Sequence, residues 1–294
     1  MIDAHHHIWR QHDLPWLLGP EQPRIFGEYE AIKRDYLINE YLGDIKHTPI
    51  ERSVYVQANW SPNWAVDEAR WVQSVADDTG WPDAIVAYAD FTSGNIDVQL
   101  ERLQQVPLVR GIRQQLHWHT APQYCFAKRP DLGSDPVFQR NINRLVDYGW
   151  CFDLQIFPSQ AEHAVALANA CPEVAFIVQH AGMLEDFTDT GWARWRRSME
   201  AMANCSNIAV KLSGLGTFTR NLNKPLIQQT VSETLQTFGI DRCMYGSNFP
   251  IEKLWTSYDD LFRTLQEVTS HLSESDVNAI FNDNAERYYR LDKP

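Results

Sequence analysis

The sequence predicts an α/β fold, a (β/α)8 barrel of the TIM type that forms a single domain over residues 1–294. Eight short apolar runs alternate with segments of helical periodicity, and parallel strands require such helical crossovers. Eight units in 294 residues fit a closed barrel better than an open doubly wound sheet. No glycine-rich phosphate loop follows any run, which weakens the dinucleotide-binding alternative.

The first predicted strand covers residues 1–9. Side chains alternate between the two faces of a strand, so His5 and His7 share one face, with Asp3 on the same face one layer further back. Buried imidazoles are costly unless they have partners, which suggests a functional site at this end. Three histidines near an N-terminus also occur in affinity tags, but a tag is longer and does not lie within an apolar strand pattern.

The remaining strands are mainly apolar runs of seven to nine residues, and the helices are amphipathic segments between them. Long connections at 10–34 and 117–134 are rich in proline, glycine and aromatic residues, and the first has no helical period. Such long loops are usually functional, and both leave the working ends of strands, so we expect them to cover the site. The predicted strands after the first are 52–59, 84–91, 108–116, 151–157, 175–182, 208–214 and 242–250. The predicted helices are 35–47, 65–79, 96–105, 135–148, 159–170, 192–204, 224–238, 258–271 and 274–288.

Composition restricts the partners. The formal net charge of −12 argues against nucleic acid and anionic membranes, and no run of 18 apolar residues is present. The N-terminus has no basic and apolar leader, and the five cysteines form no CxxC pair, which favours a cytoplasmic protein with reduced thiols. We expect a small-molecule substrate, anionic or rich in carbonyl oxygens. A homo-oligomer is compatible with the sequence.

Polar residues end all eight predicted strands, whereas the first halves of these strands are mainly apolar. In a barrel the active site lies where strands end and the following loops begin. Any one such residue can be a satisfied core residue, but the whole set predicts a shared site. Its members are His5, His7, Gln57, Asp90, Arg113, Gln155, His180, Lys211 and Asn248.

Several short motifs occur in a specific order: Asp3-Ala4-His5-His6-His7, Arg110-Gly111-Ile112-Arg113, His180-Ala181-Gly182, Lys211-Leu212-Ser213-Gly214, Gly246-Ser247-Asn248-Phe249-Pro250, Asn282-Asp283-Asn284-Ala285 and Tyr289-Arg290-Leu291. With these motifs the whole chain resembles the amidohydrolase superfamily, in its amidohydrolase-related branch of TIM-barrel metal-dependent hydrolases. The resemblance points to sugar-acid lactonases and to 2-pyrone-4,6-dicarboxylate lactonase. Other members of the wider branch are decarboxylases.

Two departures from the family pattern matter. The ends of strands four and five carry Arg113 and Gln155 instead of a bridging lysine or a further metal-binding histidine, so a site with two metal ions is not expected. The water-activating aspartate of strand eight is replaced by Asn248, which cannot take up a proton near neutral pH. Because the neighbours named so far are cationic, we expect Asn248→Asp to cost little folding stability.

The resemblance and the strand ends together give a candidate site. The catalytic candidates are His5, His7, His180 and Asn248, with His180 as the base and Asn248 as a water anchor or a donor to the oxyanion. Arg113 can instead form a salt bridge inside the barrel, to Asp90 or Asp153. The substrate-binding candidates are Gln57, Trp60, Arg113, His117, Gln155 and Lys211.

The cofactor is either none or one divalent metal ion, with zinc as the first choice. His5, His7 and His180 can hold a single ion with water in the fourth position. This set has no anionic ligand, and Arg113 and Lys211 add positive charge nearby, which weakens cation binding.

From the resemblance and the polar strand ends we expect a lactonase that opens a small carboxylated or sugar-derived lactone. The alternatives are a decarboxylase on the same barrel and a non-catalytic ligand-binding relative.

Overall fold

Eight parallel strands form one sheet in the order β1 to β8 in the computed structural model, which describes residues 1–291. The Asn248 amide donates to the His5 carbonyl (2.7 Å) and the His7 amide to the Phe249 carbonyl (2.7 Å), so the last strand returns to the first. The predicted barrel is therefore confirmed, although each strand ends earlier than expected. The strands are β1 (Ile2–His6), β2 (Arg52–Val56), β3 (Ala84–Ala87), β4 (Val109–Ile112), β5 (Cys151–Leu154), β6 (Phe176–Val178), β7 (Ile208–Leu212) and β8 (Cys243–Tyr245).

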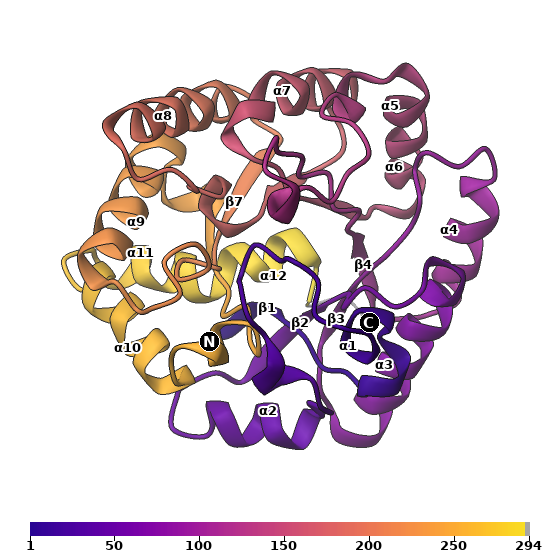
Figure 1. Ribbon diagram of the computed structural model, residues 1–294, viewed down its shortest axis with the longest axis horizontal. Coiled ribbons are helices and arrows are strands. Elements are labelled where there is room, and N and C mark those ends of the chain that lie inside the picture. The colour runs from indigo at the N-terminus through magenta and orange to yellow at the C-terminus, as the bar shows by residue number, and fades with distance from the viewer. Residues whose placement is uncertain (292–294) are drawn as a thin grey trace.

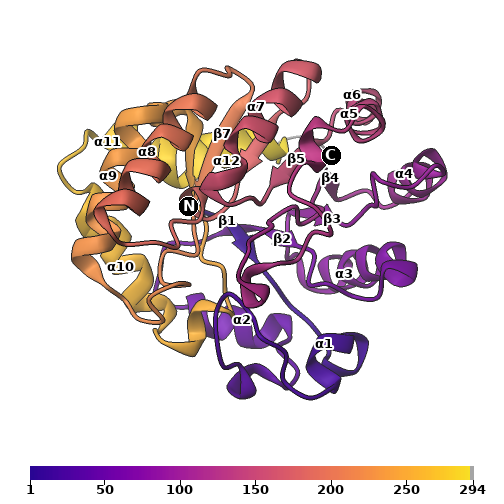
Figure 2. The same cartoon turned by 45° about the horizontal axis from the view of Figure 1, so that its top comes forward.

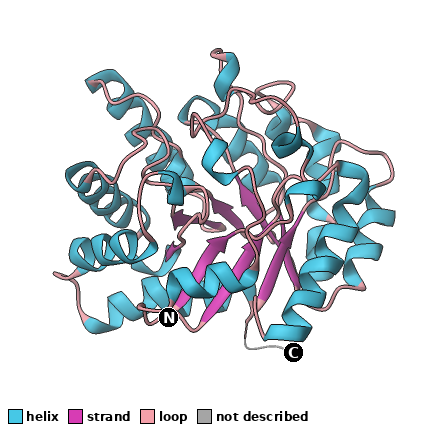
Figure 3. Ribbon diagram, turned by 60° about the horizontal axis from the view of Figure 1, so that its bottom comes forward, coloured by secondary structure: helices cyan, strands magenta, loops and turns pink. Residues whose placement is uncertain are grey.

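Helices surround the strands on the outside (Figures 1 and 3). Their bounds are α1 (Pro15–Leu18), α2 (Ile38–Ile45), α3 (Ala65–Thr79), α4 (Ile96–Gln104), α5 (Pro136–Asn143), α6 (Leu145–Tyr148), α7 (Ala161–Ala170), α8 (Asp189–Ala203), α9 (Lys224–Phe238), α10 (Tyr258–Thr269), α11 (Glu274–Asn278) and α12 (Asn284–Tyr289). The bounds predicted for α3 and α9 are confirmed. The one-turn helix α1 was missed, because four residues are too few to show a period.

Two of the predicted helices are divided. The segment expected as one helix at 135–148 consists of α5 and α6, and the segment at 274–288 has a π-helical turn, Ala279–Asp283, between α11 and α12. Within residues 1–291, no helix combines the length and the apolar character needed to cross a membrane. The cytoplasmic location stays a prediction.

The inside of the barrel is apolar at its N-terminal end and is closed there by α12. Small and β-branched residues of the strands, such as Ala4, Val54 and Val86, pack together with Ala285 and Tyr289 of α12. Figure 1 shows α12 lying across the middle of the ring of helices. Because this end is filled, the space for a site is at the opposite end, where the strands run into their longer loops.

Strand β1 departs from simple alternation. Its register with β2 shifts between Asp3 and His6, as in a β-bulge. Asp3 accepts hydrogen bonds from Tyr41 (3.0 Å) and Tyr258 (2.9 Å), which lie on α2 and α10, and His6 stacks on Tyr41. Asp3 and His6 therefore face the helices. The expectation that Asp3 shares a face with His5 and His7 is wrong, because the bulge reverses the alternation between them.

Candidate active site

A cavity opens at the C-terminal ends of the strands and contains about 740 Å³ of space, part of it open to solvent. Both long loops contribute to its walls, through Trp16 and Phe26 in the first and Phe126 in the second. Figures 1 and 2 show the first loop, with α1, beside α3. Most of the expected site residues line this cavity: His7, Gln57, Arg113, His117, Gln155, His180 and Asn248.

Four expected site residues do not line the cavity. One of them, Asp90, instead accepts a hydrogen bond from the Thr92 hydroxyl (2.6 Å). His5 is fully buried below it, in contact with the rings of His7 and His180. Lys211 is also fully buried, and its Nζ donates to Asp153 (2.8 Å), so the strand-seven cation is already paired inside the barrel. Trp60 packs against Trp71 of α3 instead of facing the cavity.

Three imidazoles gather at the floor of the site. The ring centre of His5 lies 5.1 Å from that of His7 and 5.0 Å from that of His180. His7 Nδ1 lies 2.6 Å from the Val56 carbonyl, which can only accept, so this nitrogen carries the proton. His180 Nδ1 lies 3.0 Å from the Ser213 hydroxyl. Neither ring nitrogen of His5 has a protein partner.

The backbone at the strand ends is adapted to hold these side chains. His180 (φ 55°) and Asn248 (φ 57°) both occupy the left-handed region, which is uncommon outside glycine and is often found at functional sites. Two glycines leave room for the rings. A Cβ at Gly246 would lie 2.7 Å from the Cβ of His5, and one at Gly214 would collide with the ring of His180. The sequence motifs around residues 214 and 246 therefore have a packing reason.

Burial and positive charge keep the site histidines neutral. Burial lowers the pKa of His180 well below its usual value, and the charges of Arg113 and Lys211 lower it further. Burial also lowers the pKa of His7 well below its usual value, and the positive charge of Arg113 lowers it further. The pKa of His117 falls to about 3, mainly through burial. A neutral imidazole near neutral pH can accept a proton, as a general base must.

Arg113 is a buried cation that faces the cavity. Its Nη2 donates to the Gln57 carbonyl (2.5 Å), while its Nε has no protein partner. The two carboxylates considered for it are engaged elsewhere, since Asp153 binds Lys211 and Asp90 binds Thr92. Burial lowers the pKa of Arg113 to about 10, against the raising effect of Asp153, so the group remains charged at neutral pH.

Two residues at or behind the cavity wall escaped the sequence analysis. Arg24, from the first long loop, lines the cavity and places its guanidinium 5.5 Å from the ring centre of Trp16. Glu252 is fully buried directly behind the cavity wall. Its burial raises the pKa of the carboxyl, and the neighbouring side chains of Trp255 and Asn248 lower it. The signal for Glu252 was its position four residues after Asn248, whereas nothing in the sequence fixes the path of the loop that carries Arg24.

Comparisons with known proteins agree with this architecture. The family model described as "Amidohydrolase" matches residues 2–291. The chain belongs to the amidohydrolase family. An uncharacterized Sinorhizobium fredii protein, y4mH, is 35% identical over 293 residues, which cover 99% of this chain and 98% of that protein. The L-fucono-1,5-lactonase of Burkholderia multivorans is 28% identical over 307 residues and covers all of this chain, with 97% of that enzyme matched.

A solved amidohydrolase structure bears on the metal question. An amidohydrolase of Burkholderia multivorans, solved with bound zinc, is 27% identical, with a TM-score of 0.83 and 99% of each chain covered. In the present chain the three site histidines lie close together, and the ring nitrogens of His5 have no protein partner. Yet no group of three or more His, Cys, Asp or Glu side chains within residues 1–291 has a metal-binding arrangement. The donor set does not fit a preformed metal site, so no step below passes through a metal.

Proposed function

We propose that this amidohydrolase is a lactonase, which adds water to the carbonyl carbon of a small carboxylated or sugar-derived lactone. The observation that carries the proposal is Arg113, a guanidinium that faces the cavity without a carboxylate partner. An uncompensated buried charge is costly, and guanidinium groups bind carboxylates in a two-pronged manner or polarise carbonyl oxygens. A substrate with such oxygens would satisfy Arg113.

The other polar groups of the cavity have complementary roles in this proposal. Three polar atoms of the cavity residues lack protein partners: Gln57 Nε2, Arg24 Nε and Gln155 Oε1. The two nitrogens can donate to substrate hydroxyl or carboxylate oxygens, and the Gln155 oxygen can accept from a substrate hydroxyl. His180, neutral and held by Ser213, takes a proton from the attacking water and returns it to the ring oxygen that leaves. Asn248 lines the cavity from the end of strand eight and holds the water or the developing oxyanion.

The relatives support the same reaction class. A similar protein of full length is named L-fucono-1,5-lactonase, which fits a sugar-derived lactone as the substrate class. The cavity also agrees with a small ring-shaped substrate, because Trp16, Phe26 and Phe126 supply apolar walls around the polar floor. Loop aromatics of this kind exclude water from the reacting carbonyl.

A panel of sugar-derived and carboxylated lactones, followed by acid release with a pH indicator, tests the proposal. The panel is run with and without a chelator. Arg113→Gln should raise KM roughly 10²-fold, because a charged hydrogen bond contributes about 1.5–3 kcal/mol. Arg144→Gln is the matched control, since Arg144 pairs with Asp97 on the outer helices. Release of CO2 would indicate a decarboxylase, and binding without turnover would indicate a non-catalytic relative.

A further inference from the structure

Glu252 is a buried carboxylate that the proposed mechanism does not use. It begins the short turn Glu252–Leu254 after β8 and is fully shielded from solvent. Trp255 Nε1 donates to its Oε2 (2.8 Å) and Thr217 Oγ1 to its Oε1 (3.4 Å). The Glu252 backbone amide donates to the Asn248 carbonyl (3.2 Å), and the Asn248 side chain lowers the pKa of the Glu252 carboxyl, as a donor beside it does. Asn248 and Thr217 line the cavity, so Glu252 lies directly behind the wall that faces the substrate.

The chemistry of these partners fixes the orientation of the Asn248 amide. An ionised carboxylate only accepts hydrogen bonds, whereas an amide has a donating nitrogen and an accepting oxygen. The Nδ2 amine of Asn248 must therefore face Glu252, which leaves the Oδ1 oxygen for the cavity side. Without an acceptor behind the wall, the amine would be free to turn toward the cavity, and an attacking water would meet a donor instead of an acceptor.

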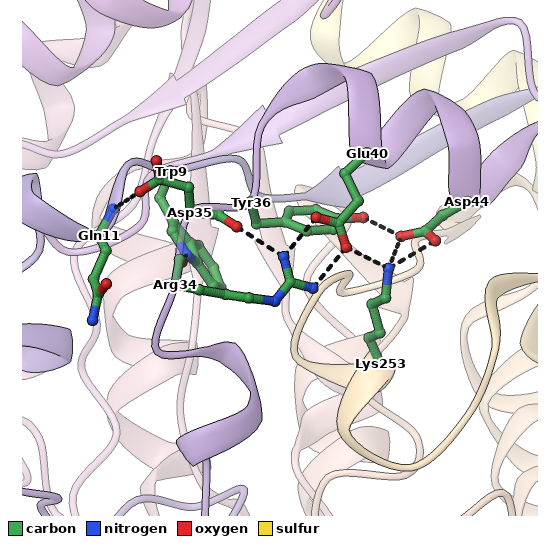
Figure 4. A network of polar contacts seen from close by, with 8 residues as sticks. All are labelled: Trp9, Gln11, Arg34, Asp35, Tyr36, Glu40, Asp44 and Lys253. Atoms are coloured by element: carbon green, nitrogen blue, oxygen red, sulfur yellow. Dashed lines mark hydrogen bonds and ion pairs between the residues drawn. The ribbon is translucent and has the colours of Figure 1, made fainter.

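The turn that carries Glu252 is fixed from its outer side. The neighbouring Lys253 reaches outward and donates to Glu40 (2.8 Å) and to both oxygens of Asp44 (2.8 and 2.7 Å) on α2. Arg34 binds the same Glu40 through two hydrogen bonds, and Figure 4 shows these side chains as one network. With Lys253 held on α2, Glu252 is directed inward to Asn248.

We propose that Glu252 is a positioning residue that fixes the Asn248 amide with its oxygen toward the cavity. It supplies, four residues later, the anionic group that strand eight lacks at position 248. This inference rests on the proposed lactonase function for its kinetic consequence. In that reaction the exposed amide oxygen accepts a hydrogen from the attacking water and turns the water's lone pair to the carbonyl carbon.

Glu252→Gln tests the proposal with little change of shape. The indole N–H of Trp255 can only donate, so it retains the oxygen of Gln and turns the new amine toward Asn248. The Asn248 amide must then reverse and present its amine to the cavity. Above neutral pH, kcat on the panel's best lactone should fall roughly 10²-fold, the usual effect of one misplaced polar group. KM should stay within about 3-fold, because Arg113 and the apolar walls are unchanged.

Glu286→Gln is the matched control. It makes the same chemical change in a carboxylate that pairs with Arg52 (2.6 Å), where β2 begins at the opposite end of the barrel. It should leave kcat and KM unchanged. An unchanged kcat in Glu252→Gln, or a loss that appears only in KM, would overturn the positioning role.

A stability measurement separates this inference from the lactonase proposal. Asn248→Asp alone places two carboxylates in contact, and Glu252→Gln alone forces the amide to reverse. The double variant restores one donor and one acceptor. Its loss of Tm should therefore be smaller than the sum of the two single-variant losses by about 2 °C or more. Additive Tm changes would overturn the contact between the side chains. If the wild-type protein opens no lactone, the lactonase proposal fails, and the Tm cycle still decides this contact.

Discussion

The buried histidines should make the fold sensitive to acid, and His6 permits the clearest test. Its ring is fully buried, stacks on Tyr41 at 4.0 Å and lies 2.9 Å from the Ser53 hydroxyl through Nε2. It faces the helices and does not line the cavity. Burial lowers the pKa of His6 from 6.5 to about 3. The perturbation is His6→Phe, which keeps the stacked ring and removes the titrating group.

The sign and the size follow from linkage. The pKa of His6 is lower in the folded state than in the unfolded state, so below pH 6.5 the unfolded chain binds the extra proton. Stability is fully present above pH 6.5 and is lost as the pH falls toward 3. The slope for one such histidine is about 1.4 kcal/mol per pH unit, or about 2 kcal/mol between pH 6.5 and pH 5. The pKa values of the buried site histidines move in the same direction, so the wild type should lose stability more steeply still.

Urea unfolding at several pH values between 7.5 and 5 measures this slope. His6→Phe should be less stable at pH 7.5, since Ser53 loses its partner at a cost of about 1 kcal/mol. Its stability should then fall less steeply than that of the wild type, by about 1.4 kcal/mol per pH unit. His47→Phe makes the same change at an exposed side chain and serves as the control. Parallel curves for the wild type and His6→Phe would refute the reasoning.

Three further results are expected. Metal analysis of the purified protein should find at most one divalent ion per chain, because strands four and five end in Arg113 and Gln155 instead of further metal ligands, and two equivalents would contradict this. Phe26→Ala and Phe126→Ala should each raise KM roughly 10-fold with little effect on Tm, because they remove apolar area from the cavity wall; unchanged KM would mean that the loops serve only as scaffold. Asn248→Ala should lower kcat roughly 10²-fold and His180→Asn more, and full activity of Asn248→Ala would make Asn248 structural.

The barrel could be predicted because its signals are local. Apolar runs and helical periods lie within short windows, and the bounds of α3 and α9 followed from them. The bulge in β1 could not be predicted in this way. It depends on how β1 pairs with β2, and the shift between Asp3 and His6 shows only in that pairing. A strict alternation therefore placed Asp3 on the wrong face.

The sequence predicted those cavity residues whose place depends only on being at the C-terminal end of a strand. His7, Arg113 and His180 face the cavity because parallel strands bring their C-terminal ends together. Lys211 also lies at the C-terminal end of a strand, but it forms an ion pair with Asp153 on β5 and does not reach the cavity. The position of Lys211 on its own strand cannot show this pairing with another strand. Arg24 lies in a long loop whose course depends on tertiary contacts, including its position over Trp16.

Asn248 shows most clearly how the structure changes an expectation. Among cationic neighbours an aspartate at this position should have cost little stability. The structure instead places the buried carboxylate of Glu252 in contact with the Asn248 side chain, and burial raises the pKa of Glu252 to about 7. A second carboxylate there would repel the first, because two adjacent buried carboxylates cannot both ionise without cost. In the proposed arrangement an amide at position 248 suits this neighbour, because it can donate to Glu252 and still present an oxygen to the cavity.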